Sequence, residues 1–374
     1  MQVILLDPNS RNDVKAFLDL PFSIYANCPQ WVPPLAVNAR HWFNRERNPF
    51  YRHSEAAFFL ACSDDGEALG RLAVLDHANH NRYHHSRTAF FYLFECIQNQ
   101  EPAHELFEAG SNWARQRGLN QMVGPRGFSA MDGAGLLVEG FEHRPAFGIP
   151  YNLPYYRDLI EAEGFELQRD MLSGYLDRRV DFPDRVHRLA QKVAERRGLH
   201  IARFRNRRDL RRIVPQIRSL YNAALADMPD NAPLTEEEAD AIAQQMIWFA
   251  DPSIIKIVQK DDQPVGFIFA YPDISAAVQR NRGRLFPFGW LGILLELRRT
   301  KWVNLNGAGI IAEQRGLGST AILISEIAHD LLQSRYDYAD FVQIRADNDK
   351  MLREVSQFGI DFYKRHRLYK KSLV

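Results

Sequence analysis

The chain has 374 residues, which is long for one ordinary domain and predicts two. It has 47 Lys and Arg residues against 46 Asp and Glu, so its formal net charge of +1 creates no overall field that would recruit nucleic acid. Its three cysteines form no CxxC pair, which argues against a disulfide framework or a structural zinc site and fits a reducing cytosol. There is no signal-peptide core and no apolar run approaching roughly 18 residues, so we expect a soluble, cytoplasmic protein.

The first half alternates between short apolar runs and amphipathic stretches. A hairpin is predicted at Asp64-Asp65-Gly66, and Gly118 is placed as the C-cap of a helix. The glycine- and proline-rich residues 125–154 are expected to form a long functional loop. The predicted strands are 2–6, 56–62, 68–76, 88–96, 121–124 and 171–176, and the predicted helices are 12–27, 101–117 and 155–162.

An Arg-rich helix over 182–197 is interpreted as a connector, after which the same order of elements returns. The predicted strands are 200–205, 254–259, 264–271, 302–312, 339–345 and a final strand through Tyr369; the predicted helices are 210–225, 235–249, 315–334 and 347–357. The two halves therefore form an internal structural repeat. Alternating hairpins and helices predict an α+β domain, twice.

The turn after the strand 302–312 is the most informative stretch. Arg315, Gly316 and Gly318 lie between an apolar strand and a long amphipathic helix. Glycines let the backbone approach a ligand closely, and a helix start presents unpaired N–H groups that favour phosphate or pyrophosphate. The turn matches neither a P-loop nor the dinucleotide fingerprint, and an ordinary strand–turn–helix remains the alternative.

This element order, with Arg-x-x-Gly-x-(Ser/Thr) after the fourth strand, resembles the GNAT acyltransferase superfamily. The resemblance covers 200–374 and, more weakly by element order, 1–180. The whole chain looks like a bacterial tandem-GNAT protein. It implies GNAT-like domains over 1–180 and 200–374, joined by a connecting helix over 181–199, each a mixed, mostly antiparallel sheet flanked by helices.

The resemblance also implies acyl-CoA as a co-substrate and no metal. Backbone N–H groups from Arg315 to Thr320 would hold the pyrophosphate, and the strand end at 310–312 would pair with the pantetheine arm. Thr320 departs from the superfamily motif, which has Gly or Ala there. The implied donor-binding residues are Ile310, Ile311, Ala312, Arg315, Gly316, Leu317, Gly318, Ser319, Thr320 and Asn348.

GNAT enzymes often place an Asn at the start of the next helix and a Tyr seven residues later as general acid. Asn348 fits the first position, but Val355 occupies the second and has no proton to give. Tyr363 and Tyr369 lie downstream as substitutes, although tyrosines in strand patterns are more often packing residues. The C-terminal half therefore lacks the usual acid.

The first half has no Arg-x-x-Gly-x-Gly turn, so we expect it not to bind CoA in the same way. Glu95 ends its fourth strand, where GNAT enzymes often hold the carboxylate that deprotonates the amine, and a carboxylate beside an apolar strand would have a raised pKa. A salt-bridged strand-end residue is the alternative. Asp132, Asn152, Tyr155 and Tyr156 supply further polar groups, of which one tyrosine ring is expected to be buried. The candidate catalytic residues are Glu95, Asn152 and Tyr156.

Two other segments carry signals. His77, His80, His84 and His85 could face one side of a helix, but with no second ligand cluster we predict no metal site. Residues 280–301 form an insertion with an apolar centre, 285–297, and basic flanks. It suits a membrane-interface segment, a lid over a long acyl chain, or a helix buried between the two domains.

Together these features predict an acyl-CoA-dependent N-acyltransferase that transfers an acyl group, long-chain in one version, to a small-molecule or lipid-like amine. The apolar insertion 285–297 adds peripheral contact with the inner membrane face to the expected cytoplasmic location. One alternative is a non-catalytic protein that binds acyl-CoA or a membrane. Another is aminoacyl transfer of the peptidoglycan type, against which the near-neutral charge counts.

Overall fold

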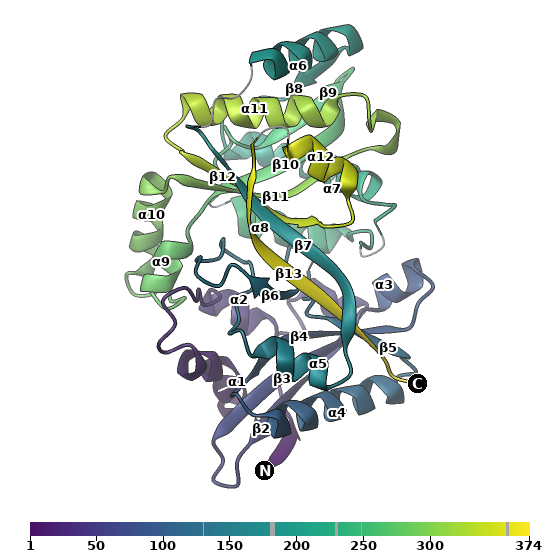
Figure 1. The fold of residues 1–374 in the computed structure, drawn as a ribbon, viewed down its shortest axis with the longest axis vertical. Helices are drawn as coiled ribbons and strands as arrows, with labels where there is room; N and C mark the ends of the chain where they lie inside the picture. Colours follow the sequence, from purple (N-terminus) through teal and green to yellow (C-terminus); the bar gives the residue numbers. More distant parts are fainter. Residues whose placement is uncertain (130, 180–183, 229–230, 248, 357–358) are drawn as a thin grey trace. The chain divides into compact units, whose positions relative to one another are not determined.

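The computed structural model describes residues 1–129, 131–179, 184–228, 231–247, 249–356 and 359–374 (Figure 1). The chain forms two compact units. Unit 1 consists of residues 1–171, 275–292 and 364–374, and unit 2 consists of residues 172–274 and 293–363.

Unit 1 is built on a mixed sheet with the strand order β1-β2-β3-β4-β5-β13, and β6 also pairs with β13. Its pairs are antiparallel except for β4 and β5, which run parallel from Thr88↔Gln121 to Phe90↔Val123. The strands are β1 (Gln2–Leu5), β2 (Glu55–Cys62), β3 (Ala68–Asp76), β4 (Thr88–Cys96), β5 (Gln121–Gly124), β6 (Leu136–Glu139) and β13 (Asp361–Ser372). The first residues of β13, 361–363, belong to unit 2.

Helices cover both faces of this sheet. On one face α4 buries Leu106, Phe107 and Ala114, spaced for a single helix side, and α5 joins the same core. On the other face α1 contributes Phe17 to a second core. The helices of unit 1 are α1 (Arg11–Ile24), α2 (Ala36–His41), η1 (Pro49–Arg52), α3 (Ala78–Tyr83), α4 (Gln100–Gln116), α5 (Tyr156–Ala162) and α9 (Ser275–Arg280).

Unit 2 repeats the plan with the strand order β7-β12-β11-β10-β9-β8. Strands β11 and β12 are parallel, while β8 to β11 form antiparallel pairs. The strands are β7 (Glu166–Asp177), β8 (Leu199–Ile201), β9 (Lys256–Lys260), β10 (Gln263–Pro272), β11 (Trp302–Ile310) and β12 (Tyr338–Arg345).

One face of the sheet of unit 2 packs against α11 and α6, and α7 covers the other. The helices are α6 (Asp184–Arg197), α7 (Arg207–Ala224), α8 (Glu236–Ile247), α10 (Gly289–Arg299), η2 (Ala312–Gln314), α11 (Ser319–Gln333) and α12 (Asp349–Ser356). The first turn of α10, residues 289–292, belongs to unit 1. None of the helices in the described ranges is long and apolar enough to cross a membrane.

The predicted α+β fold with two similar units is confirmed, and most element bounds agree within a few residues. Several details differ, since α2 and α9 were not predicted and the strand predicted over 171–176 begins at Glu166. Helix α11 begins at Ser319 rather than Arg315, because Gly316 and Gly318 have φ values of 72° and 93° that no helix continues. Strand β6 lies inside the predicted loop 125–154, and the strand predicted over 200–205 stops at Ile201. Residues 130, 181–183, 248 and 357, which also fell within predicted elements, lie outside the described ranges.

The compact units also differ from the contiguous domains predicted from the sequence. The C-terminal residues 364–374 belong to unit 1 because β13 pairs with β5 from Tyr369↔Gly124 to Ser372↔Gln121. Residues 275–292 belong there because Gln279 donates to the carbonyls of Pro29 and Trp31. Both contacts join residues about 250 positions apart, which local sequence patterns do not encode.

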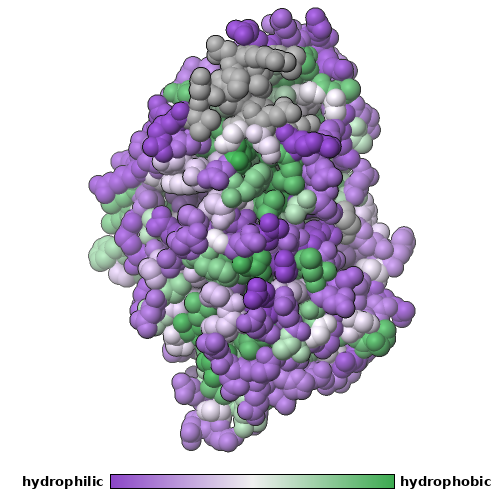
Figure 2. All heavy atoms as spheres, in the orientation of Figure 1, coloured by the Kyte–Doolittle hydropathy of each residue, from purple (hydrophilic) through white to green (hydrophobic). Residues whose placement is uncertain are grey.

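The insertion 280–301 is not a buried helix. Six of its large apolar side chains are exposed, on the loop before α10 and on one side of α10 itself. The face shown in Figure 2 is otherwise mostly hydrophilic, with hydrophobic atoms in separate patches.

Candidate functional site

Strands β11 and β12 separate part-way along their length. The parallel pairing described for them runs from Trp302↔Tyr338 to Leu305↔Phe341, although β11 continues to Ile310. A bulge lies at the same place, because the register between β10 and β11 shifts opposite Gly307, whose φ is 101°. Backbone groups of β11 beyond Leu305 are thus available to an extended ligand on the side of β12.

The turn at the start of α11 is suited to an anion. The N-cap residue is Gly318, so no side chain satisfies the first N–H groups of the helix. The hydroxyl of Ser319 is buried and has no hydrogen-bond partner among the described residues. A Cβ placed on Gly316 would lie 3.0 Å from the ammonium nitrogen of Lys350, so this cation stands over the turn. Helix start, hydroxyl and ammonium together would stabilise a phosphate.

The side chain of Arg315 is already engaged. Its Nε donates to the carbonyl of Ile310 (3.0 Å), and its two terminal nitrogens donate to the carbonyl of Ala224 (2.8 Å) and to Asp227 Oδ2 (2.7 Å). These bonds tie the end of β11 to the end of α7. The guanidinium therefore supports the turn, and the backbone N–H of Arg315 is also engaged, because it donates to the carbonyl of Ala312 (3.2 Å).

Two further residues implied by the resemblance make bonds within the fold. The backbone N–H of Ile311 donates to Val265, so this group points toward β10 and away from β12. The side chain of Asn348 accepts from the N–H of Met351 (3.1 Å) and thereby caps α12. Val355 is fully buried in the core of unit 2.

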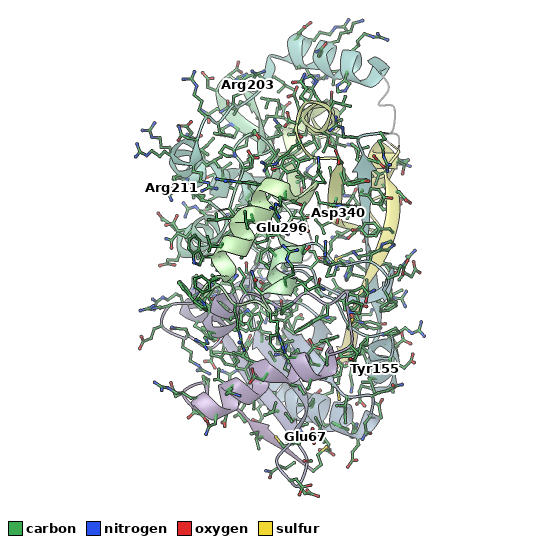
Figure 3. The ribbon with its side chains drawn as sticks, turned by 90° about the vertical axis from the view of Figure 1, so that its left-hand side faces the viewer. Glu67, Tyr155, Arg203, Arg211, Glu296 and Asp340 are labelled. Carbon is green, nitrogen blue, oxygen red and sulfur yellow. The ribbon has the colours of Figure 1, made fainter. Side chains whose placement is uncertain are left out.

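A row of polar side chains crosses the sheet just before β11 and β12 separate. The hydroxyl of Tyr363 donates to Asp340 Oδ2 (2.7 Å), and Asn304 donates to Asp273 Oδ1 (2.9 Å). Asn304 and Asp340 are register partners, which joins the two pairs (Asp340 is labelled in Figure 3). Burial first, and then the charge of Asp340, raises the pKa of Tyr363 well above its ordinary value.

The sequence analysis considered Tyr363 but missed Asp340, Asn304 and Asp273. The available signal was polar residues within otherwise apolar strands, as in Tyr-Ala-Asp-Phe-Val at 338–342. Asn304 and Asp340 alternate with Val303 and Ala339, which pack in the core against α11. They therefore lie on the opposite face of the sheet.

In unit 1, Glu95 and Tyr156 are brought together. Their hydrogen bond is 2.7 Å long, and the hydroxyl of Tyr25 donates to the same carboxylate oxygen at 2.6 Å. Arg71, itself buried, approaches the other oxygen at 3.6 Å and donates to the carbonyl of Phe17. Burial raises the pKa of Glu95, whereas Arg71 and the two tyrosine hydroxyls act in the opposite direction. Glu95 is thus held in a nearly closed cluster.

Asn152 and Asp132 have other roles in unit 1. The amide of Asn152 accepts from the N–H of Leu137 (2.7 Å) and donates to its carbonyl (3.0 Å), which fixes β6. Asp132 accepts from the N–H of Ser129 (2.9 Å), and burial raises its pKa to about 6. Tyr155, labelled in Figure 3, donates to the carbonyl of Cys96 (2.7 Å).

Helix α4 of unit 1 stands where α11 stands in unit 2, but its start is closed. The side chain of Asn99 accepts from the N–H of Glu101 (3.1 Å), and only residues 97–99 separate β4 from the helix. Among the described residues, the features suited to a phosphate thus lie at the start of α11 and not at the start of α4.

Solved structures resemble the chain over its whole length. A tandem GNAT protein from the clavulanic acid biosynthesis pathway (without AcCoA) gives a TM-score of 0.59 at 12% identity, covering 100% of this chain and 98% of that chain. The chain has the tandem GNAT fold. A GCN5-related glucosamine N-acetyltransferase region of a fungal multi-domain GH3 β-N-acetylglucosaminidase also gives 0.59 at 12% identity, covering 99% of this chain and 38% of that one.

Two relatives of this tandem GNAT chain match it almost from end to end. The protein YghO of Escherichia coli (strain K12) is 27% identical over 371 residues, which is 97% of this chain and 94% of that protein. The bacterial ceramide synthase of Caulobacter vibrioides (strain NA1000 / CB15N) is 25% identical over 372 residues, or 96% of this chain and 95% of that protein. No protein-family profile matches the chain.

Three histidines of the run, His77, His80 and His84, lie close together on and beside α3. The rings of His80 and His84 lie 4.5 Å apart, and His77 caps the helix by accepting from the N–H of His80. Burial lowers the pKa of His80 to about 2, so this ring stays neutral. Across the described ranges, no group of three or more His, Cys, Asp or Glu side chains could hold a metal ion.

Proposed function

We propose that this tandem GNAT chain is an acyl-CoA-dependent N-acyltransferase whose donor binds to unit 2. The observation that carries the proposal is the turn between β11 and α11. Its open helix start, the unpartnered hydroxyl of Ser319 and the ammonium of Lys350 offer a pyrophosphate three kinds of donor. The separation of β11 from β12 provides room for the extended pantetheine arm beside a free strand edge.

The thioester of such a donor would end near the polar row, where β11 and β12 come together. There the amine nitrogen attacks the carbonyl carbon, the C–S bond breaks, and one amine proton must reach the leaving thiolate. Asp340 receives that proton through the hydroxyl of Tyr363, and the same relay returns it to the thiolate. Tyr363 thus acts as the general acid, the role that the superfamily gives to a tyrosine where this chain has Val355.

Glu95 is the alternative base, with Tyr156 beside it and Asn152 as a third group from the same half of the chain. Its carboxylate accepts two tyrosine hydrogen bonds and faces Arg71, which favours a structural role. A comparison of Glu95→Gln with Asp340→Asn distinguishes the two bases.

The bacterial ceramide synthase relative supports a long-chain version of the reaction. A ceramide is the amide of a fatty acid with a long-chain amino alcohol, so its formation is N-acylation of a lipid-like amine. We therefore propose a long-chain acyl-CoA as donor and a long-chain amino alcohol as acceptor. The alternative is a tandem GNAT protein that binds acyl-CoA without turnover, which Val355 at the usual acid position favours.

Calorimetric titration with acetyl-CoA and palmitoyl-CoA, followed by measurement of thiol release with sphinganine, tests the proposal. We expect binding of palmitoyl-CoA and release of thiol only with an amine present. Lys350→Glu should weaken donor binding, whereas Lys370→Glu, an exposed lysine on β13, should not. Binding without release favours the non-catalytic alternative. If neither CoA binds, or Lys350→Glu and Lys370→Glu behave alike, the donor site is wrong.

A further inference from the structure

The segment 281–299 displays an apolar surface where most surface segments are polar. Phe286 and Phe288, in the loop before α10, are 80% and 72% exposed. On α10, Trp290, Leu291, Leu294 and Leu295 are also exposed. Their spacing places them on one side of the helix, while Ile293 on the other side is buried. The apolar face of α10 therefore points to solvent, the reverse of an ordinary surface helix.

This apolar surface, defined by Phe286, Phe288, Trp290, Leu291, Leu294 and Leu295, is bordered by cations. Arg282 and Arg284 precede it, and Arg298 and Arg299 follow it; all four are exposed. Glu296 is the only acidic residue between 280 and 301. Figure 3 shows Glu296 on α10, on the side turned toward the viewer. Figure 2 has the orientation of Figure 1, and it shows apolar atoms at the surface along the edge where Figure 1 draws α10.

The loop that carries the phenylalanines is held by the fold. Asn281 donates to the carbonyl of Gly289 (2.9 Å), and the carbonyl of Gly283 accepts from the N–H of Ala36 (2.9 Å). Side chains presented by a fixed loop do not fold back to hide themselves from water. Their exposure is thus a property of the native chain, and the transfer of these side chains from water into an apolar phase would be favourable.

We propose that this surface docks the protein onto an anionic lipid bilayer. Exposed aromatic and leucine side chains enter the headgroup region, and arginines at both ends lie against lipid phosphates. The charge of the surface favours a bilayer over a second copy of this chain. Four exposed arginines around an apolar patch complement anionic lipids, but they would repel the arginines of the same patch on a second copy. Docking of this kind is independent of the acyl-transfer chemistry proposed above.

Vesicle co-sedimentation of the full chain tests the proposal without an activity readout. We expect binding to phosphatidylcholine vesicles that contain phosphatidylglycerol, weaker binding to phosphatidylcholine alone, and release by salt. The triple variant Phe286→Ala/Phe288→Ala/Trp290→Ala should lower the partition coefficient at least about tenfold. Its control is Leu167→Ala/Leu332→Ala, two exposed leucines elsewhere, which should bind as the wild type does.

A charge pair provides a second measurement. Arg298→Gln/Arg299→Gln should lower binding about tenfold, whereas Arg211→Gln/Arg212→Gln, which removes the same charge from exposed positions on α7, should change it little. Equal losses in the two pairs would show nonspecific attraction and overturn the proposal. Vesicle binding by the triple variant at the wild-type level would also overturn it. A third contrary outcome is a wild-type dimer in light scattering that becomes a monomer in the triple variant, with no vesicle binding by either protein.

Discussion

The hydroxyl of Tyr363 on β13 donates a 2.7 Å hydrogen bond to Asp340 on β12. Asp340 is only 2% exposed, and Asn304, its register partner on β11, is bonded to Asp273. Two buried carboxylates, an amide and a phenol thus meet on one face of the sheet, next to the point where β11 and β12 separate.

Removal of the Tyr363 hydroxyl should affect chemistry rather than donor binding. We expect Tyr363→Phe and Asp340→Asn each to reduce kcat by about 10²- to 10⁴-fold, the usual contribution of a proton-transfer group, with the Kd for acyl-CoA unchanged. Tyr369→Phe is the matched control, because its hydroxyl donates to Glu161 in unit 1. A kcat that falls equally in Tyr369→Phe would remove the special role of Tyr363.

Glu95→Gln should leave turnover within about threefold of the wild type if its cluster is structural. The amide oxygen of glutamine could still accept from Tyr25 and Tyr156 at the same position. Steady-state kinetics of Glu95→Gln and Asp340→Asn, side by side, provide the check. Loss of turnover in Glu95→Gln together with full activity in Asp340→Asn would show that Glu95, and not Asp340, is the general base.

Substitution of Gly318 should damage both the fold and the donor site. Alanine there meets an unfavourable φ of 93°, and its Cβ would lie 2.7 Å from Cγ1 of Val193 on α6. We expect Gly318→Ala to lower the free energy of unfolding by about 2 to 4 kcal/mol and to abolish CoA binding. Gly66→Ala, with a φ of 82° and no atom within 4 Å of the new Cβ, should lose only about 1 kcal/mol. Urea denaturation measures both, and equal losses would contradict the packing argument.

Asp132 should make unit 1 less stable as the pH rises. Burial raises its pKa from 3.8 to about 6, so the folded state holds this proton more tightly than the unfolded state does. Its stabilising contribution is present below pH 3.8 and is lost as the pH rises through about 6; the pKa difference corresponds to about 3 kcal/mol. Asp132→Asn should remove this loss and raise the free energy of unfolding at pH 8.

Asp170 provides the opposite case for the same denaturation series. Burial alone would raise its pKa, but hydrogen bonds and charges from Arg367 and Arg365 hold the pKa below its usual value. Its contribution is therefore present near neutral pH and lost in acid. Asp170→Asn should lower the free energy of unfolding at pH 8, and the same sign for both variants would refute the pKa argument.

The sequence by itself determined the local elements and the character of one turn. Apolar periodicity predicted the bounds of β4 and β5 to the residue. The apolar pattern of each strand is a local property, which does not depend on how the strand is paired with its neighbours. Gly316 and Gly318 predicted the turn before α11, because only a residue without a Cβ adopts those φ values at no cost. The basic flanks of 285–297 were likewise visible in the sequence alone.

Only the tertiary structure decided which polar groups meet. Tyr363 and Asp340 are 23 positions apart, and Asn304 and Asp273 are 31 apart; each pair depends on strand register, which is set by long-range pairing. The same holds for Glu95, whose carboxylate is surrounded by Tyr25 and Arg71 from other elements. The exposure of Phe286 and Trp290 also depends on the tertiary structure, because the sequence fits a buried helix and an exposed one equally well. The packing of Ile293 in the core determines which side of α10 faces solvent.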